Sequence, residues 1–206
     1  MATALFGFIA ALLLHVGVAQ EPVPSEPPGF TIGRGSGSAK VQLDALANHY
    51  EPEDLRVKAV LFPLPFHQHG FTAAESVFTI TSALGDDHFT PWLEVLYNNQ
   101  ERFWNKATKD LSAVQVTNEV KELAKKTFPA LTDKQWEKGM TGYGGTEADQ
   151  NTRVTWKYAC TRTVTGTPQY KSNGVPFEDA DSSWKLEDWL KVIDPLVKAD
   201  KPKYDL

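Results

Sequence analysis

Cysteine is almost absent from this chain, whose 206 residues contain only Cys160. One cysteine excludes an internal disulfide, although small domains of oxidising compartments usually pair their cysteines, and it excludes a Cys-x-x-Cys redox motif. The Gly-x-Ser-x-Gly motif of hydrolases is missing as well, so the sequence does not support that class of enzyme. Because Asn-x-Ser/Thr is also absent, we expect no N-linked glycan.

The sequence also lacks a phosphate-binding loop. The glycine-rich residues 142–147 (GYGGTE) follow no predicted strand and lead to no Lys-Ser/Thr pair, and a nucleotide-binding loop requires both. We interpret this segment as a flexible entry to the helix that follows it. The sequence therefore predicts no nucleotide cofactor, and no other motif in it predicts a cofactor of another kind.

Positive charge is too sparse for a nucleic-acid binder. The 21 Lys and Arg residues are outnumbered by 26 Asp and Glu residues, which gives a net charge of -5 and a pI near 5.5. No stretch holds five consecutive basic residues, which is typical of a solvated surface. We expect neither a nucleic-acid partner nor electrostatic binding to anionic membranes. The content of 41% hydrophobic and 23% charged residues is typical of one globular domain.

The first twenty residues contain no Asp, Glu, Lys or Arg. Residues 5–18 form an apolar run, interrupted by His15, and small residues occur at Gly17 and Ala19. This pattern is typical of a signal peptide, residues 1–19, cleaved after Ala19, whereas a membrane span needs about 20 apolar residues. An uncleaved signal anchor is the alternative, because the usual positive charge at the start is missing. We expect the mature chain in the secretory pathway, either extracellular or in the ER lumen.

The following segments predict a leader and two strands. Residues 20–39 are rich in Pro, Gly and Ser and indicate an extended leader. Residues 41–45 alternate like a short strand, and residues 46–50 allow one helical turn at most. Residues 55–62 have a strong period of two and predict a strand that ends at Pro63.

Four longer helices are predicted next, each with a recognisable start. Three starts are capping boxes, in which a Ser or Thr is followed three residues later by an acidic or amide side chain, and one is a Thr-Pro pair. These starts are Thr72 with Glu75, Thr90 with Pro91, Ser112 with Gln115, and Thr146 with Asp149. The helices are expected over residues 72–84, 90–106, 112–126 and 146–162, with a shorter turn starting at Thr132.

A hairpin and a last helix complete the pattern. Asn173 and Gly174 tolerate the positive φ of a tight turn, and residues 169–171 and 175–177 flank them as short strands. Residues 183–198 form an amphipathic helix. This order of elements predicts an α/β fold, with helices on both faces of a mixed sheet.

Several stretches of the chain resemble the DsbA-like branch of the thioredoxin-like superfamily, in which a helical block is inserted into the core. They are residues 62–75 (FPLPFHQHGFTAAE), 98–105 (NNQERFWN), 153–170 (RVTWKYACTRTVTGTPQY), 173–175 (NGV) and 189–196 (WLKVIDPL). The resemblance implies a thioredoxin-like domain over residues 40–200, with the helical insertion at about 72–162 and a tail at 201–206.

The resemblance also gives a role to Thr167 and Pro168. The family has a cis-proline at this place, and we interpret the Thr167–Pro168 bond as cis. Backbone groups before that proline pair with an extended substrate peptide, which is a form of strand addition. The resemblance therefore implies an extended peptide or protein as the partner of this loop.

The reactive turn of the family is missing from this sequence. Working members carry Cys-x-x-Cys or Cys-x-x-Ser at a helix N-terminus, where the helix dipole stabilises the thiolate. Only residues 46–54 separate the two predicted strands, whereas a parallel crossover with its helix needs at least about 10–12 residues. We expect an incomplete first βα unit. It indicates a degenerate member, a splice form or a gene prediction with a skipped exon, and the clean match on both sides of residues 45 and 46 favours the last two.

Two functional hypotheses follow. The first is a secretory thioredoxin-fold protein that lacks the redox cysteine pair, has no catalytic activity and binds a peptide or protein at the cis-proline loop. The second is a thiol-disulfide oxidoreductase whose active-site segment is absent from this form. Cys160 lies on a different element from the family's reactive cysteine, and we expect it to be a small buried residue with a structural role. No catalytic residue is assigned.

Histidines offer the remaining candidates for metal binding. His67 and His69 are expected to share one face of a strand end, but a specific site usually needs three or four ligands. We expect His67 to cap the strand end by bonding to the backbone. The turn at Asp86, Asp87 and His88 has the same shortage of ligands, so the sequence predicts no metal site.

Overall fold

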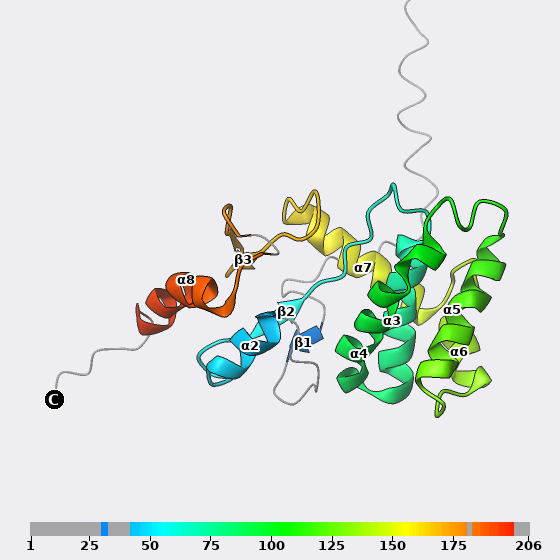
Figure 1. Cartoon of the computed structure of the whole chain (residues 1–206), viewed down its shortest axis with the longest axis horizontal. Coiled ribbons are helices and arrows are strands. Elements are labelled where there is room, and N and C mark those ends of the chain that lie inside the picture. Colours follow the sequence, from blue (N-terminus) through cyan, green and yellow to red (C-terminus); the bar gives the residue numbers. More distant parts are fainter. Residues whose placement is uncertain (1–29, 33–41, 181–182, 200–206) are drawn as a thin grey trace, which may run out of the picture.

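The computed structural model describes residues 30–32, 42–180 and 183–199, and these residues combine seven α-helices with two small sheets (Figure 1). The expected signal peptide, most of the leader and the tail lie outside the described residues. The elements are β1 (Phe30–Ile32), α2 (Gln42–His49), β2 (Val57–Ala59), α3 (Gly70–Leu84), α4 (Phe89–Asn98), α5 (Ala113–Thr127), α6 (Asp133–Gly139), α7 (Glu147–Thr161), β3 (Lys171–Ser172), β4 (Val175–Pro176) and α8 (Leu186–Ala199), with short 3-10 turns at Asp86–His88 and Gln100–Phe103. The broad α/β class is as predicted.

The strands do not join into the single mixed sheet that the sequence predicts. Among the described residues, β1 pairs antiparallel with β2, and β3 pairs antiparallel with β4, as two separate sheets. The strand expected over residues 55–62 shortens to β2. Part of the expected leader is itself a strand, because the Phe-Thr-Ile of β1 consists of aromatic and β-branched residues that favour strands and has β2 as a partner.

Helix α2 corrects the strand predicted over residues 41–45. Its sequence QLDALANH has no β-branched residue and contains good helix formers such as Leu, Ala and Gln. Leu46 and Tyr50, four residues apart, are both buried, which is the spacing of one helix face. The short alternation at its start was therefore too weak to define a strand.

The helical block, defined as α3 to α7, holds the larger core. Val77 and Ile80 of α3 are completely buried, and they pack with Trp92, Val120 and Trp136 from the surrounding helices. The indole Nε1 of Trp92 donates to Ser76 Oγ at 2.9 Å inside this core, so the buried polar atom has a partner, as buried donors require. Figure 1 shows the five helices gathered at one end of the molecule.

The predicted helix starts had mixed outcomes. Both bonds of the capping box are present at Ser112 and at Thr132, and the Thr146 hydroxyl accepts from the Asp149 N–H at 3.0 Å. The box predicted at Thr72 is wrong, because α3 begins at Gly70 and its N-cap makes no side-chain bond. The caps at Ser112, Thr132 and Thr146 need partners only within a few residues. Helix α3 begins before Thr72, where the turns of residues 65–69 lead into it.

Helix α4 is shorter than predicted and ends at Asn98 rather than near residue 106. The consecutive Asn98 and Asn99 favour termination, because Asn side chains compete for backbone hydrogen bonds. The Asn99 amide donates to the Val95 carbonyl at 2.8 Å and closes the helix. A 3-10 turn then continues to Phe103.

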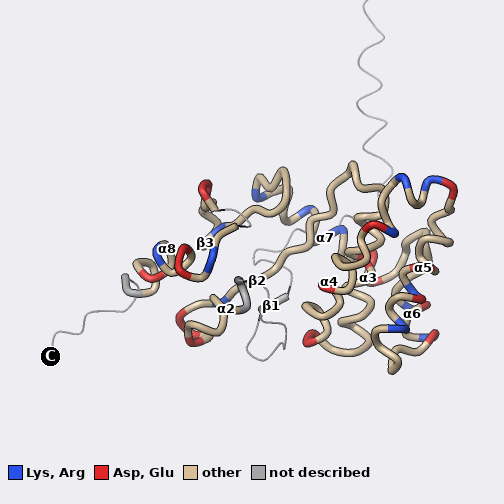
Figure 2. Tube along the Cα trace, viewed as in Figure 1, with Lys and Arg blue, Asp and Glu red and all other residues tan. Residues whose placement is uncertain are grey.

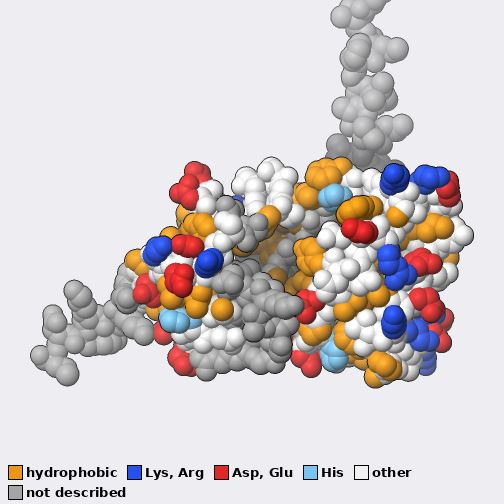
Figure 3. All heavy atoms as spheres, viewed as in Figure 1, with side chains coloured by type: hydrophobic (Ala, Val, Ile, Leu, Met, Phe, Trp, Pro, Cys, Tyr) orange, Lys and Arg blue, Asp and Glu red, His pale blue; other side chains and the backbone are white. Residues whose placement is uncertain are grey.

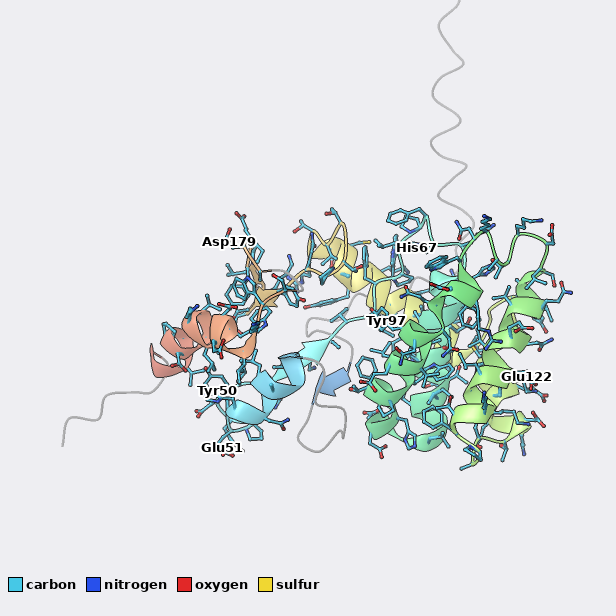
Figure 4. The ribbon with its side chains drawn as sticks, viewed as in Figure 1. Tyr50, Glu51, His67, Tyr97, Glu122 and Asp179 are labelled. Atoms are coloured by element: carbon cyan, nitrogen blue, oxygen red, sulfur yellow. The ribbon has the colours of Figure 1, made fainter. Side chains whose placement is uncertain are left out.

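The α2/α8 group, defined as α2, the β3–β4 hairpin and α8, forms a second core. Trp189 and Ile193 of α8 pack against Leu46 and Tyr50, as the predicted amphipathic helix requires. The Tyr50 hydroxyl lies between α2 and α8 (Figure 4) and donates to Asp194 Oδ1 at 2.7 Å. Burial and this carboxylate raise the pKa of Tyr50 to about 12, so the phenol stays a donor at physiological pH.

The surface carries charges of both signs. Figure 2 shows Lys and Arg interspersed with Asp and Glu along α5 and α6, where Lys121 and Lys125 both contact Asp133. On the face drawn in Figure 3, hydrophobic side chains are scattered among the charged ones. No helix within the described ranges is both long enough and apolar enough to cross a bilayer.

Candidate functional site

The loop between α7 and β3 is the first candidate, and the end of α7 positions it. The helix ends at Thr161, and the Val164 N–H returns to the Ala159 carbonyl at 3.0 Å. Thr163 has a φ of 60°, a left-handed conformation that turns the chain away from the helix axis. Lys171 Nζ donates to the Arg162 carbonyl and ties the start of β3 back to the helix end.

Thr167 and Pro168 are both exposed in this loop. Their peptide bond is cis, so that prediction is confirmed. Within the described part of the chain, no hydrogen bond engages the backbone of Gly166 or Thr167. An exposed backbone without internal partners is available for bonds to another chain.

The loop leads directly into a strand with an open edge. Lys171 and Ser172 of β3 pair with Pro176 and Val175 of β4, and the sheet has no third strand among the described residues. Asn173 and Gly174 form the turn with φ values of 48° and 86°, as predicted. Unpaired strand edges are natural templates for the addition of a further strand.

Cys160 is exposed, and the prediction that it is buried is wrong. The inward face of α7 is formed by Thr152, Thr155 and Ala159, and Cys160 falls one position beyond it. Trp156 lies four residues earlier, on the same outward side of the helix, and is 39% exposed. Its ring stacks on Phe62 with 6.2 Å between centroids. An aromatic surface therefore precedes the loop along α7.

A polar pocket between α3 and α7 is the second candidate. Residues 142–145 cover a cavity of about 180 Å³ that Glu75, Asp149 and Arg153 line together with Phe71, Thr72 and Tyr143. Arg153 Nε contacts both carboxylate oxygens of Asp149 at 3.0 Å. This pocket was not predicted from the sequence, although Asp149 and Arg153 have the four-residue spacing of a helical ion pair.

Glu75 is the unusual member of this pocket, since it is only 4% exposed. Burial, followed by the nearby charge of Asp149, raises the pKa of Glu75 to about 7. Contact with the Thr146 hydroxyl and the charge of Arg153 offset part of that rise. A carboxyl that titrates near neutral pH in a cavity is a feature of functional sites. The interpretation of Glu75 as a cap residue concealed it in the sequence.

The histidines do not form the predicted arrangement. His67 and His69 lie in turns before α3 instead of on a strand, and the His67 ring contacts Phe66 edge-on at 4.8 Å. Burial lowers the pKa of His69. His88 Nδ1 lies 3.0 Å from Asp87 Oδ1 in an exposed 3-10 turn. In the described ranges, no three His, Cys, Asp or Glu side chains lie close enough to hold a metal ion.

Comparison with known proteins identifies no relative. No protein-family model matches the chain, and no curated protein or solved structure is significantly similar to it. Two places on the molecule therefore remain as candidate sites: the exposed backbone at Thr167 and the pocket around Glu75.

Proposed function

We propose that this chain is a secretory-pathway protein of the thioredoxin-like, DsbA-like type, that it has no redox activity, and that it binds an extended peptide or protein segment at Thr167 and Pro168. The observation that carries the proposal is the backbone of the half-buried Gly166 and the exposed Thr167, which lacks hydrogen-bond partners within the described part of the chain and leads into the open edge of β3. The single cysteine excludes a dithiol reaction within one chain.

The binding mode follows from the backbone groups. An added strand gains affinity from main-chain hydrogen bonds and specificity from alternate side chains. Thr167 offers one N–H and one C=O, and β3 adds its outer edge. Trp156 and Phe62, on the outward side of α7, offer an apolar surface to a side chain of the partner. Because few backbone groups take part, the complex is expected to be weak and tolerant of sequence.

The test measures binding of a fluorescent, reduced and alkylated insulin B chain, which serves as an extended peptide without disulfides. Thr167→Pro removes the N–H donor, whereas the matched control Thr167→Ala keeps it. We expect Thr167→Ala to bind like the native chain and Thr167→Pro to lose binding, with circular dichroism verifying that both retain their helices. Equal binding by both variants, or no binding by the native chain at millimolar concentration, would refute the proposal.

The second candidate function is a thiol-disulfide exchange reaction that uses Cys160, and the observation that favours it is the exposure of this thiol. The attacking species would be a thiolate, and reactive thiols usually have a cationic neighbour or a helix N-terminus. Cys160 lies instead in the last turn of α7, where the helix dipole disfavours negative charge. We therefore favour peptide binding over exchange.

A further inference from the structure

Glu75 has an unmet need for a hydrogen-bond donor inside the pocket. The Thr146 hydroxyl approaches Glu75 Oε1 at 3.4 Å, but the same hydroxyl lies 2.8 Å from the Gly139 carbonyl. A hydroxyl has one hydrogen to donate, and the shorter contact takes it. In the described part of the chain, no other hydrogen bond reaches the Glu75 carboxylate. A nearly completely buried carboxylate without a donor is costly.

Asp149, in contrast, is fully engaged. Arg153 contacts both of its oxygens, and the Gly145 N–H donates to Oδ2 at 3.3 Å. Gly144, with a φ of 79°, packs so closely that a Cβ atom would lie 3.2 Å from the Asp149 carboxyl carbon. The covering loop is therefore shaped around Asp149, and the open space of the cavity remains for a partner of Glu75.

The residues that line the cavity limit the chemical class of a ligand that could bind to Glu75. An anion is disfavoured, because Glu75 and Asp149 both line the cavity and the cationic Arg153 beside them is already paired with Asp149. A divalent metal is disfavoured, because Arg153 already neutralises Asp149 and no third ligand of the usual kind is near within the described ranges. Phe71 and Tyr143 line the rest of the cavity, but the Phe71 ring already lies 5.6 Å from the Arg153 guanidinium and Tyr143 is 84% exposed, so the attraction for a cation comes from Glu75.

The size of the cavity further limits the ligand that could occupy it. Typical pockets for whole ligands measure about 300–1,000 Å³, whereas this one measures about 180 Å³. That volume suits the end of a short alkyl chain with one polar head, not a complete cofactor.

We propose that this pocket binds a primary alkylammonium group, with the nitrogen donating to the Glu75 carboxylate and the alkyl chain lying against Phe71 and Tyr143. The ammonium supplies both the charge and the donors that Glu75 lacks. The group belongs either to a free alkylamine or to a lysine side chain of another protein. This site is separate from Thr167, because its residues lie on α3, on residues 142–145 and on the first half of α7.

The test uses calorimetric titration with three probes: n-butylamine, Nα-acetyl-lysine methylamide, and n-butanol as the uncharged control. We expect n-butylamine to bind and n-butanol not to bind. Binding of the lysine derivative as well identifies a lysine side chain as a source, whereas binding of n-butylamine alone identifies a free amine. Equal affinity for n-butanol, or no heat from either amine at millimolar concentration, overturns the proposal.

Variants and pH locate the site. Glu75→Gln keeps the shape of the side chain and is expected to abolish amine binding, whereas Glu147→Gln removes an exposed charge of α7 outside the pocket and is expected to bind normally. The charged groups that face Glu75 are Asp149 and Arg153, both on α7. Because the pKa of Glu75 is about 7, amine affinity should rise about tenfold between about pH 6 and about pH 8. Full binding by Glu75→Gln would refute the assignment.

Discussion

Replacing Glu75 by Gln should make this protein more stable at alkaline pH, and the structure provides the magnitude. The pKa of this carboxyl rises from its ordinary 4.5 to about 7 in the folded chain, mainly through burial. Each tenfold change in proton affinity corresponds to about 1.4 kcal/mol, so the ionised carboxyl lowers the free energy of unfolding by roughly 3 kcal/mol. Total stabilities are about 5–15 kcal/mol, so this cost is a large fraction.

The direction with pH follows from which state binds the proton more tightly. The folded state binds the proton of Glu75 more tightly, so the stability contributed by the protonated carboxyl is complete below pH 4.5 and is lost as pH rises through about 7. Well above that value the free energy of unfolding no longer changes through this group. Glu75→Gln cannot ionise and removes this loss. The variant should match the native chain near pH 4.5 and exceed it at pH 8 by up to roughly 3 kcal/mol.

Urea unfolding followed by tryptophan fluorescence at about pH 5 and about pH 8 measures both quantities. The His69 pKa is lowered by burial, so this residue acts in the opposite direction and loses stabilisation as pH falls through its range. That contribution is common to both chains and cancels in their difference. Glu147→Gln, the exposed control, should keep the pH dependence of the native chain. An unchanged pH dependence in Glu75→Gln would refute the argument from burial.

Three further predictions test packing, capping and the thiol. Gly139→Ala should destabilise the chain by about 1–3 kcal/mol, because the new Cβ would lie 2.3 Å from Thr79 Oγ1. Gly166→Ala, whose new Cβ would meet nothing within 4 Å, is the control in urea unfolding. Equal effects of the two variants would contradict the close packing of α6 on α3. Ser112→Ala should cost about 1 kcal/mol in the same assay, since it removes the cap of α5, and an unchanged midpoint would show that the cap contributes nothing. Cys160 should react with a maleimide in the native chain as fast as in urea, because it is exposed, and protection in the native state would contradict this. Insulin reduction should stay at background both in the native chain and in Cys160→Ser, and turnover that depends on Cys160 would contradict that expectation.

Some features that depend only on neighbouring residues were predicted correctly, whereas the capping box at Thr72 was not. The capping box at Ser112 needs only a hydroxyl and an amide side chain within three positions. The turn at Asn173 and Gly174 needs only residues that tolerate a positive φ. Helix α2 was not predicted, because Leu46, and Tyr50 directly after the helix end, pack against residues of α8, which lies far along the chain.

The residues of the two candidate sites also differ in whether local sequence or distant contacts define them. Thr167 and Pro168 were identified from local sequence and their resemblance to a family loop; their bond is cis and both residues are exposed, whereas peptide binding there stays a prediction. The Glu75 pocket was missed, because Thr146 and Glu75 are separated by 71 positions. Cys160 was assigned to the wrong side of α7, since neighbouring positions of a helix differ in exposure only after its packing partner is known.

The sequence was enough to predict helices α5 and α7, the tight hairpin at Asn173 and Gly174 and the absence of a dithiol centre, because hydrogen bonds between near neighbours and the residue inventory are properties of the chain alone. The burial of Glu75, the exposure of Cys160 and the pairing of the described strands as two separate sheets follow only from the folded chain. Burial, the pKa values that follow from it and strand pairing depend on groups that folding brings together from distant parts of the chain.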